Sequence, residues 1–167
     1  MSIYFVAGGA RSGKSRKGEE LAKSLAGSSR PIFIATAEAV DEEMASRIKK
    51  HQDDRGTAFD LVEESKNLTK ALKDVDTEAT VLVDCLTLWL SNNMMGEGTD
   101  TNQSVIDTAR ARKGATIFIS NEVGESIVPM HPVSREFRDL SGIMNQQFAQ
   151  AADKVYFMKF GIAQELK

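Results

Sequence analysis

The sequence predicts one α/β domain, 1–167, in which a mostly parallel central sheet is flanked by helices. Segments with strand-like and helix-like patterns alternate along the chain, as they do in βαβ units. The strongest strand candidates are continuous apolar runs, which are typical of strands covered on both faces. The length of 167 residues fits a single domain, and no linker, repeat or low-complexity tract divides the chain.

The first half of the chain supplies three predicted strands and three predicted helices. An apolar run ending in glycines predicts a strand over 3–7, and good helix formers follow over 14–26. A Gly-Ser-Ser-Arg-Pro turn precedes a strand at 32–36. Acidic residues begin and lysines end the predicted helix 41–52, which complements the helix dipole. A short strand at 59–63 and a helix at 67–73 complete this half.

The second half continues the alternation. The run 80–84 predicts a third strong strand, followed by an apolar helix at 86–90 and a polar, glycine-containing loop over 92–103. A helix ending near residue 112 leads into a strand at 116–120. A helix over 137–152 carries Phe137, Leu140, Met144 and Phe148 at helical spacing, which predicts a core stripe or a subunit interface. A last strand is predicted at 154–160.

Composition excludes several classes of protein. The 21 basic and 24 acidic residues give a net charge of −3, whereas nucleic-acid-binding domains usually carry a basic surplus. Nucleic acid is therefore not expected as a partner. One cysteine, Cys85, excludes an internal disulfide framework and favours a reducing cytoplasm. The N-terminal apolar run is short and its basic residues follow it, so no signal peptide or integral membrane segment is predicted.

The strongest motif is a phosphate-binding loop. Gly8-Gly9-Ala10-Arg11-Ser12-Gly13-Lys14-Ser15 matches G-x-x-x-x-G-K-[ST] directly after a predicted strand and before a predicted helix. Glycines let backbone N–H groups surround phosphate oxygens at a helix N-terminus. Lys14 is expected to reach the β- and γ-phosphates, and the Ser15 hydroxyl to ligate Mg²⁺. The alternative is a glycine-rich turn with an incidental lysine.

Asp84 is the candidate for a second magnesium ligand. It ends the apolar strand 80–84, the position of the carboxylate that helps to hold the metal in phosphate-loop enzymes. The alternative is an aspartate that caps the following helix.

His51 is the candidate nucleophile. Arg47 precedes it and Arg55 follows it by four residues, and nearby positive charge disfavours the imidazolium form. A neutral imidazole can attack phosphorus while guanidinium groups hold the phosphates. On spacing alone, an ordinary surface histidine on a charged helix is the favoured interpretation.

The ordered set of motifs resembles one known family over nearly the whole chain. Besides the phosphate loop, the resemblance rests on residues 34–36, 41–51, 82–92, 120–124, 127–129, 135–139, Gly142, 145–146 and 152–153. Together these resemble the bifunctional adenosylcobinamide kinase / adenosylcobinamide-phosphate guanylyltransferase family of cobalamin biosynthesis. The resemblance implies a P-loop NTPase-like fold of the RecA-like kind.

The resemblance also implies two reactions at one site. The terminal phosphate of ATP or GTP passes to adenosylcobinamide, and GMP from GTP then passes to adenosylcobinamide phosphate through a covalent GMP-histidine. By motif that histidine is His51. The implied nucleotide contacts beyond the phosphate loop are Thr36, Ala37, Glu38, Gln52, Asp53, Asp54, Arg55, Glu63 and Asp84. A homo-oligomer, specifically a trimer, is implied as well.

The remaining predictions concern two methionines near the end of a predicted helix and two alternative functions of the chain. Met94 and Met95 are interpreted as core or loop residues, with a corrinoid-facing surface as the alternative. One alternative function is a monofunctional P-loop kinase of a small metabolite, in which His51 is idle. The other is a nucleotide-dependent regulatory protein, although the chain lacks the N-K-x-D guanine motif of Ras-like switches.

Overall fold

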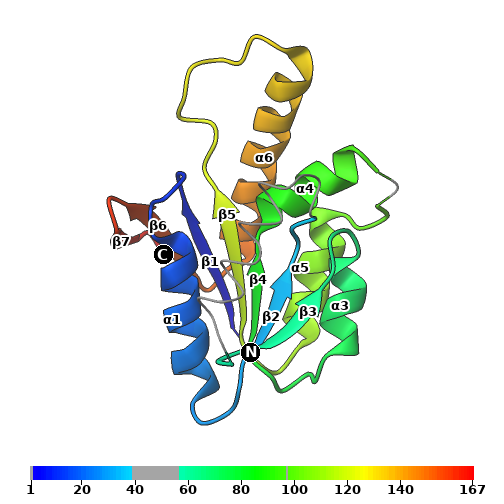
Figure 1. Ribbon diagram of the computed structural model, residues 1–167, viewed down its shortest axis with the longest axis vertical. Coiled ribbons are helices and arrows are strands. Elements are labelled where there is room, and N and C mark those ends of the chain that lie inside the picture. Colours follow the sequence, from blue (N-terminus) through cyan, green and yellow to red (C-terminus); the bar gives the residue numbers. More distant parts are fainter. Residues whose placement is uncertain (1, 39–56, 97) are drawn as a thin grey trace.

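A computed structural model describes residues 2–38, 57–96 and 98–167. Strands and helices alternate through most of this part of the chain, as predicted (Figure 1). The strands are β1 (Ile3–Gly8), β2 (Ile32–Ala35), β3 (Asp60–Glu63), β4 (Val81–Asp84), β5 (Thr116–Asn121), β6 (Lys154–Lys159) and β7 (Ile162–Glu165). The helices are α1 (Lys14–Ala26), α3 (Leu68–Asp74), α4 (Leu86–Met94), α5 (Asn102–Ala111) and α6 (Pro132–Ala151).

The strands form one sheet in the order β3-β2-β4-β5-β1-β6-β7. Every neighbouring pair is parallel except β6 and β7, which are antiparallel. The prediction of a mostly parallel sheet is therefore confirmed. All the parallel strands end at one edge, and ligands of such sheets bind at this carboxyl edge.

Two apolar clusters cover the two faces of the sheet. Val6, Leu82 and Ile119 belong to the cluster that contains Ala22 of α1, so they define the α1 face. The opposite face buries a larger cluster with residues of α3, α4, α5 and α6. Because both faces are covered, the central strands are apolar throughout and do not alternate.

Two helix boundaries differ from the prediction by several residues. Helix α6 begins at Pro132, five residues before the predicted start, and α4 continues to Met94. Proline is favoured in the first turn of a helix, since its missing N–H has no partner there. Apolar residues near the start of α6 are exposed rather than buried. The apolar spacing of a core-facing helix, on which the prediction relied, therefore does not begin at Pro132.

Strand β7 was not predicted. Phe160 and Gly161 both have positive φ, 56° and 79°, which suits the two-residue turn of a tight hairpin. Lys159 and Ile162 therefore pair directly across the turn. The predicted helix 41–52 lies outside the described residues. In the part of the chain described, no helix is both long enough and apolar enough to cross a membrane.

Candidate nucleotide-binding site

The predicted phosphate loop joins β1 to α1, which puts it at the carboxyl edge of the sheet. Gly13 has φ 94° and stands at the N-cap of α1, a conformation that glycine adopts without strain. Gly8 has no room for a side chain, because a Cβ there would lie 2.6 Å from both the Met158 carbonyl oxygen and Ser12 Oγ. The motif glycines thus allow the tight loop that aims the first amides of α1 at an anion.

The loop already contains polar groups suited to a phosphate. Lys14 Nζ donates to the Gly9 carbonyl at 3.2 Å, so the ammonium folds back over its own loop. Ser12 Oγ is buried and has no hydrogen-bond partner among the described residues. A buried hydroxyl without a partner costs free energy unless a ligand or water satisfies it. Both groups fit a site that a phosphate completes.

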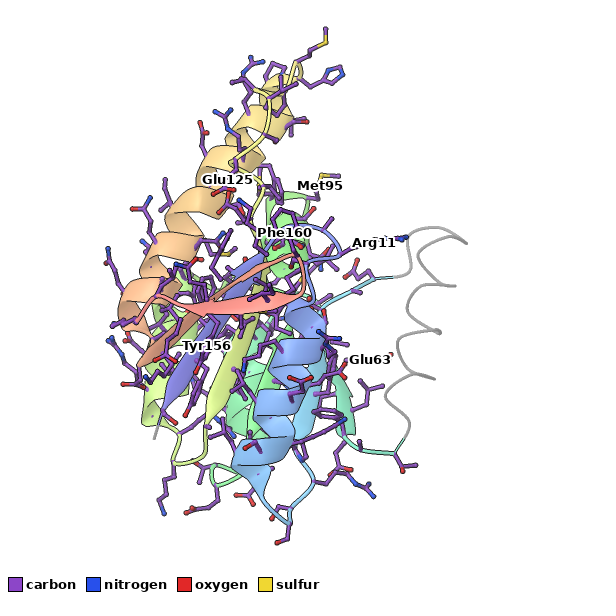
Figure 2. All side chains as sticks on the ribbon, turned by 90° about the vertical axis from the view of Figure 1, so that its left-hand side faces the viewer. Arg11, Glu63, Met95, Glu125, Tyr156 and Phe160 are labelled. Atoms are coloured by element: carbon purple, nitrogen blue, oxygen red, sulfur yellow. The ribbon has the colours of Figure 1, made fainter. Side chains whose placement is uncertain are left out.

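The turn between β6 and β7 supports the loop from the far side. Gly161 N donates to the Ser12 carbonyl at 3.1 Å, and Gly161 Cα would lie 3.4 Å from a Cβ on Gly13. Phe160 stands beside this contact with 88% of its surface exposed. Figure 2 shows Phe160 and Arg11 at this same edge of the molecule. Sequence reasoning missed this support, since nothing local in 160–161 indicates a partner near residue 12.

Two predicted carboxylates lie in one row of the sheet. Ala35 pairs with Glu63 on one side and with Asp84 on the other. Residues paired in parallel strands point to the same face, and Leu82, two residues before Asp84, belongs to the α1 face. Glu63 and Asp84 therefore face the same side of the sheet as the phosphate loop, about 10 Å apart across two strand spacings.

The charges of Asp84 and Lys14 both affect the pKa of the Cys85 thiol, so the two side chains lie near the same residue. Burial raises the pKa of the Cys85 thiol to about 12, and the Asp84 carboxylate adds to the increase. The Lys14 ammonium lowers the same pKa. The lysine of the loop and the carboxylate of β4 thus both lie within electrostatic range of this thiol. The Asp84–Cys85 peptide bond is cis.

Thr36 is part of the framework of the site. It is fully buried, its N–H donates to the Asp84 carbonyl, and its hydroxyl accepts from Cys85 N at 2.7 Å and donates to Cys85 O at 2.8 Å. Asn92 Nδ2 donates to the Thr36 carbonyl at 2.8 Å. Each polar group of Thr36 has a partner within the protein, so direct contact with nucleotide remains a prediction. Its observed bonds hold the end of β2 against β4 and α4.

The other predicted contacts fall into two groups. Ala37 and Glu38 follow β2 at the carboxyl edge, where the exposed Glu38 accepts a hydrogen bond from Ser65 Oγ at 2.5 Å. His51, Gln52, Asp53, Asp54 and Arg55 lie outside the described residues, so their roles remain predictions.

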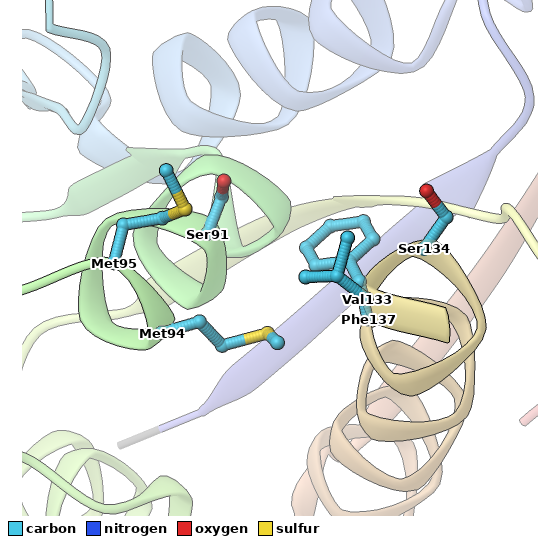
Figure 3. A pocket seen from close by; sticks show the side chains of 6 residues that line it. All are labelled: Ser91, Met94, Met95, Val133, Ser134 and Phe137. Carbon is cyan, nitrogen blue, oxygen red and sulfur yellow. The ribbon is translucent and has the colours of Figure 1, made fainter. Parts of the chain in front are cut away.

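A small apolar pocket opens between α4 and α6 (Figure 3). Met94 and Met95 of the α4 end line it opposite Val133 and Phe137 of α6. Met95 is 84% exposed just after the end of α4, which fits the loop alternative of its interpretation as a core or loop residue. Of the four residues in the predicted core stripe of α6, Met144 and Phe148 are buried. Phe137 is half-buried and Leu140 is exposed.

Comparison with known proteins places this geometry in a family. A family model described as cobinamide kinase / cobinamide phosphate guanyltransferase matches residues 4–166. This chain belongs to that family. The family resemblance in the sequence is thereby confirmed over nearly its whole length.

Named relatives match the chain from end to end. The bifunctional adenosylcobalamin biosynthesis protein CobU of Escherichia coli is 34% identical over 99% of both chains. The corresponding protein CobP of Pseudomonas aeruginosa is 36% identical over 97% of this chain and 95% of its own. The chain therefore spans nearly the full length of both relatives.

A solved structure supports the fold alone. The flagellar accessory protein FlaH from Methanocaldococcus jannaschii superposes with a TM-score of 0.58 at 13% identity, covering 99% of this chain and 78% of that chain. The expected RecA-like P-loop fold is confirmed by this likeness together with the sheet order.

Proposed function

We propose that this chain performs both reactions that name its family at one nucleotide site: phosphorylation of adenosylcobinamide and guanylylation of adenosylcobinamide phosphate in cobalamin biosynthesis. The observation that carries the proposal is the phosphate loop at the carboxyl edge, on the same face as two carboxylates in register. Full-length membership of the family supports the choice of substrates.

In the kinase reaction, the hydroxyl of the aminopropanol arm attacks the terminal phosphorus of ATP or GTP. A new O–P bond forms as the hydroxyl releases its proton to solvent, the bond to the β-phosphate oxygen breaks, and the nucleoside diphosphate leaves. Lys14 and the loop amides hold the phosphates in line and offset the charge that develops on the leaving group. This chain's contribution is mainly positioning and electrostatic stabilisation.

In the guanylyl reaction, an imidazole nitrogen of His51 attacks the α-phosphorus of GTP. The P–N bond forms as the bond to pyrophosphate breaks, and the imidazole loses its proton. A phosphate oxygen of adenosylcobinamide phosphate then displaces the histidine and gives adenosylcobinamide-GDP. The covalent intermediate divides one difficult displacement into two easier ones.

Mg²⁺ fits the donors of this site. No group of three or more His, Cys, Asp or Glu side chains within residues 2–38, 57–96 and 98–167 is placed to hold a metal. Magnesium in nucleotide sites needs only one or two protein oxygens, because phosphates and waters supply the rest. The Ser15 hydroxyl and the Asp84 carboxylate would hold the ion, which supplies charge neutralisation on the phosphates.

Glu63 is proposed to select guanine over adenine. The guanine edge presents N1–H and N2–H₂ as donors, whereas an ionised carboxylate only accepts hydrogen bonds. Glu63 faces the same side of the sheet as the phosphate loop, which makes such a contact geometrically reasonable.

A homotrimer in the cytoplasm is the proposed working form. Val133, Leu140 and Ile143 form an exposed apolar stripe on α6, 58%, 37% and 51% exposed. Spacings of seven and three residues put them on one side of the helix, where a partner subunit would cover them. The single buried cysteine fits a reducing compartment.

Labelling with GTP carrying a radioactive α-phosphate tests the two-step chemistry. In the presence of Mg²⁺, the wild-type protein should acquire acid-labile, base-stable label, as expected for a phosphoramidate. His51→Ala should abolish the label. His131→Ala is the matched control, because His131 is exposed at the start of α6 and is not implicated in the chemistry.

The same assay separates the alternative functions. Label that persists in His51→Ala would show that the assigned nucleophile is wrong. Wild-type protein that phosphorylates adenosylcobinamide but never acquires label would be a monofunctional kinase. Slow hydrolysis of GTP without any phosphorylated corrinoid would favour the regulatory protein.

A further inference from the structure

A buried polar network lies behind the carboxyl end of β5. Ser120 Oγ donates to Asn145 Oδ1 of α6 at 2.6 Å and lies 3.3 Å from Thr87 Oγ1 of α4. Ser120 is fully buried, and Thr87 and Asn145 are 6% and 9% exposed. Buried polar groups are tolerated when they are hydrogen-bonded to one another, and a satisfied network of this kind makes its surroundings rigid.

The network fixes the backbone of Asn121, the last residue of β5. Asn121 N donates to Thr87 Oγ1 at 2.7 Å, and Asn145 Nδ2 donates to the Asn121 carbonyl at 3.2 Å. The next residue, Glu122, donates its N–H to the carbonyl of Gly8, the first residue of the phosphate loop, at 3.0 Å. Two helices thus hold the backbone of Asn121, and the phosphate loop holds the residue that follows it.

The side chain of Asn121 lies on the face that carries the phosphate loop. Side chains alternate along a strand, and Ser120 points toward α6. Its neighbour Ile119 lies on the opposite face, where a Cβ on Gly18 of α1 would come within 2.7 Å of Ile119 Cδ1. Asn121 shares the face of Ile119 and stands two residues nearer the carboxyl edge.

The register places Asn121 between the two phosphate-handling elements. Asn121 pairs with Gly8 of β1, and Asp84 of β4 pairs with Ile119. Strand β5 lies between β4 and β1, so Asn121 flanks both the carboxylate and the loop. In phosphate-loop sites the loop lysine and the metal ligands engage the β- and γ-phosphates.

The carboxamide of Asn121 has no hydrogen bond within the part of the chain described, although its residue is half-buried. Asn92, Asn93 and Asn145, by contrast, all donate through their side chains. We propose that Asn121 is a phosphate-contact residue, whose Nδ2 donates to an oxygen of the terminal phosphoryl group of the bound nucleoside triphosphate. This inference rests on the proposed nucleotide site and adds a residue that distinguishes triphosphate from diphosphate.

Binding of GTP and GDP to Asn121→Ala tests this role. Loss of a hydrogen bond to a charged group corresponds to about a tenfold or larger fall in affinity. We expect GTP affinity, measured by titration calorimetry with Mg²⁺, to fall at least about tenfold while GDP affinity is unchanged. Asn121→Asp should weaken GTP further, because a carboxylate repels the phosphate.

Asn102→Ala is the matched control, because Asn102 lies at the start of α5 and its side chain donates to Gln147 rather than facing the nucleotide site. An unchanged ratio of GTP to GDP affinity in Asn121→Ala would overturn the proposal. Equal weakening of both nucleotides would assign Asn121 a structural role and would also overturn it. Wild-type protein that binds neither nucleotide would instead refute the proposed function, and this inference with it.

Discussion

Cys85 shows how burial controls the chemistry of a single side chain. The thiol is 5% exposed beside the Asp84 carboxylate, and both factors disfavour the thiolate. Burial is the larger cause of the rise in its pKa from 9.0 to about 12. A thiol in this state is a small apolar residue of the core and is unsuited to act as a nucleophile.

We expect the Cys85 thiol of the folded protein to resist alkylation by iodoacetamide at pH 8 and to react fully after denaturation in guanidinium. At pH 8 a pKa of about 12 leaves only about one thiol in ten thousand ionised. Mass spectrometry of timed samples measures the labelled fraction. Labelling of the native protein at the rate of a free cysteine would contradict the assignment.

The same pKa predicts a pH dependence of stability. Above pH 9 the unfolded chain releases the thiol proton while the folded chain retains it, so stability falls as the pH rises from about 9 toward 12. Cys85→Ala should remove this part of the decline in urea denaturation series.

Arg112 is a buried charge that serves the fold. It is 4% exposed and donates to the carbonyls of Leu72, Asp76 and Ala79 at 2.7 to 2.9 Å. Burial lowers its pKa, and the charge of Asp76 acts in the opposite direction. Its three acceptors are all backbone oxygens, so the guanidinium joins α3, the following loop and the end of α5.

At the residue scale, the phosphate loop was predictable and the partners of Thr36 were not. The eight residues from Gly8 to Ser15 form a local motif whose chemistry depends on spacing alone. Thr36 is hydrogen-bonded to Cys85, 49 positions later in the chain. No pattern in the sequence around either residue predicts a contact between positions so far apart. Asn121 is similar, since its importance appears only once Thr87 and Asn145 are seen on its backbone.

Among the elements, α4 connects the ends of two strands. Asn92 Nδ2 donates to the Thr36 carbonyl after β2 at 2.8 Å and to the Ser65 carbonyl after β3 at 3.1 Å. Trp89 Nε1 donates to the Lys66 carbonyl at 2.8 Å. One helix thereby holds the backbone that carries Ala37, Glu38 and Glu63 in place.

We expect Asn92→Asp to lower the free energy of unfolding by about 1–3 kcal/mol, because it replaces a shared donor with a charged acceptor facing two carbonyls. The KM for nucleotide should rise more than kcat falls, since the end of β2 loses its support. Urea denaturation and steady-state kinetics measure the two effects. Asn102→Asp, a change at a half-buried residue at the start of α5, away from the ends of β2 and β3, should leave the KM unaltered. An unchanged KM in Asn92→Asp would refute the positioning role.

The core elements were predictable because burial leaves a periodic pattern, whereas the peripheral ones were not. Strands β1, β4 and β5 are covered on both faces and appear in the sequence as apolar runs. Strand β7 is exposed at all four positions and depends on the turn at Phe160 and Gly161. The first turns of α6 contain no fully buried residue, so no core-facing stripe marks their start.

For the whole molecule, the first half of α6 is a prominent exposed feature. Figure 1 shows it extending beyond the carboxyl edge of the sheet. Its stripe of Val133, Leu140 and Ile143 continues from the exposed Ile127, Val128 and Met130 of the preceding loop. Exposed apolar surface of this kind often marks an interface.

We expect sedimentation equilibrium to give a mass of about 55 kDa, three times the 18.3 kDa of one chain. Ile143→Glu should shift the mass toward that of a monomer, because a charge would then be buried in the interface. Gln150→Glu, an exposed change at the other end of α6, should leave the trimer intact. A wild-type mass of one chain would exclude the trimer.

The hydrogen bond from Gly161 N to the Ser12 carbonyl has a consequence for how the protein folds during its translation. Strand β1 lies between β5 and β6, both of which are translated more than a hundred residues after it. The ribosome therefore releases the phosphate loop long before the turn that supports it. A nascent chain acquires the supported loop only after this turn has emerged, so affinity for nucleotide cannot guide the earliest stages of folding.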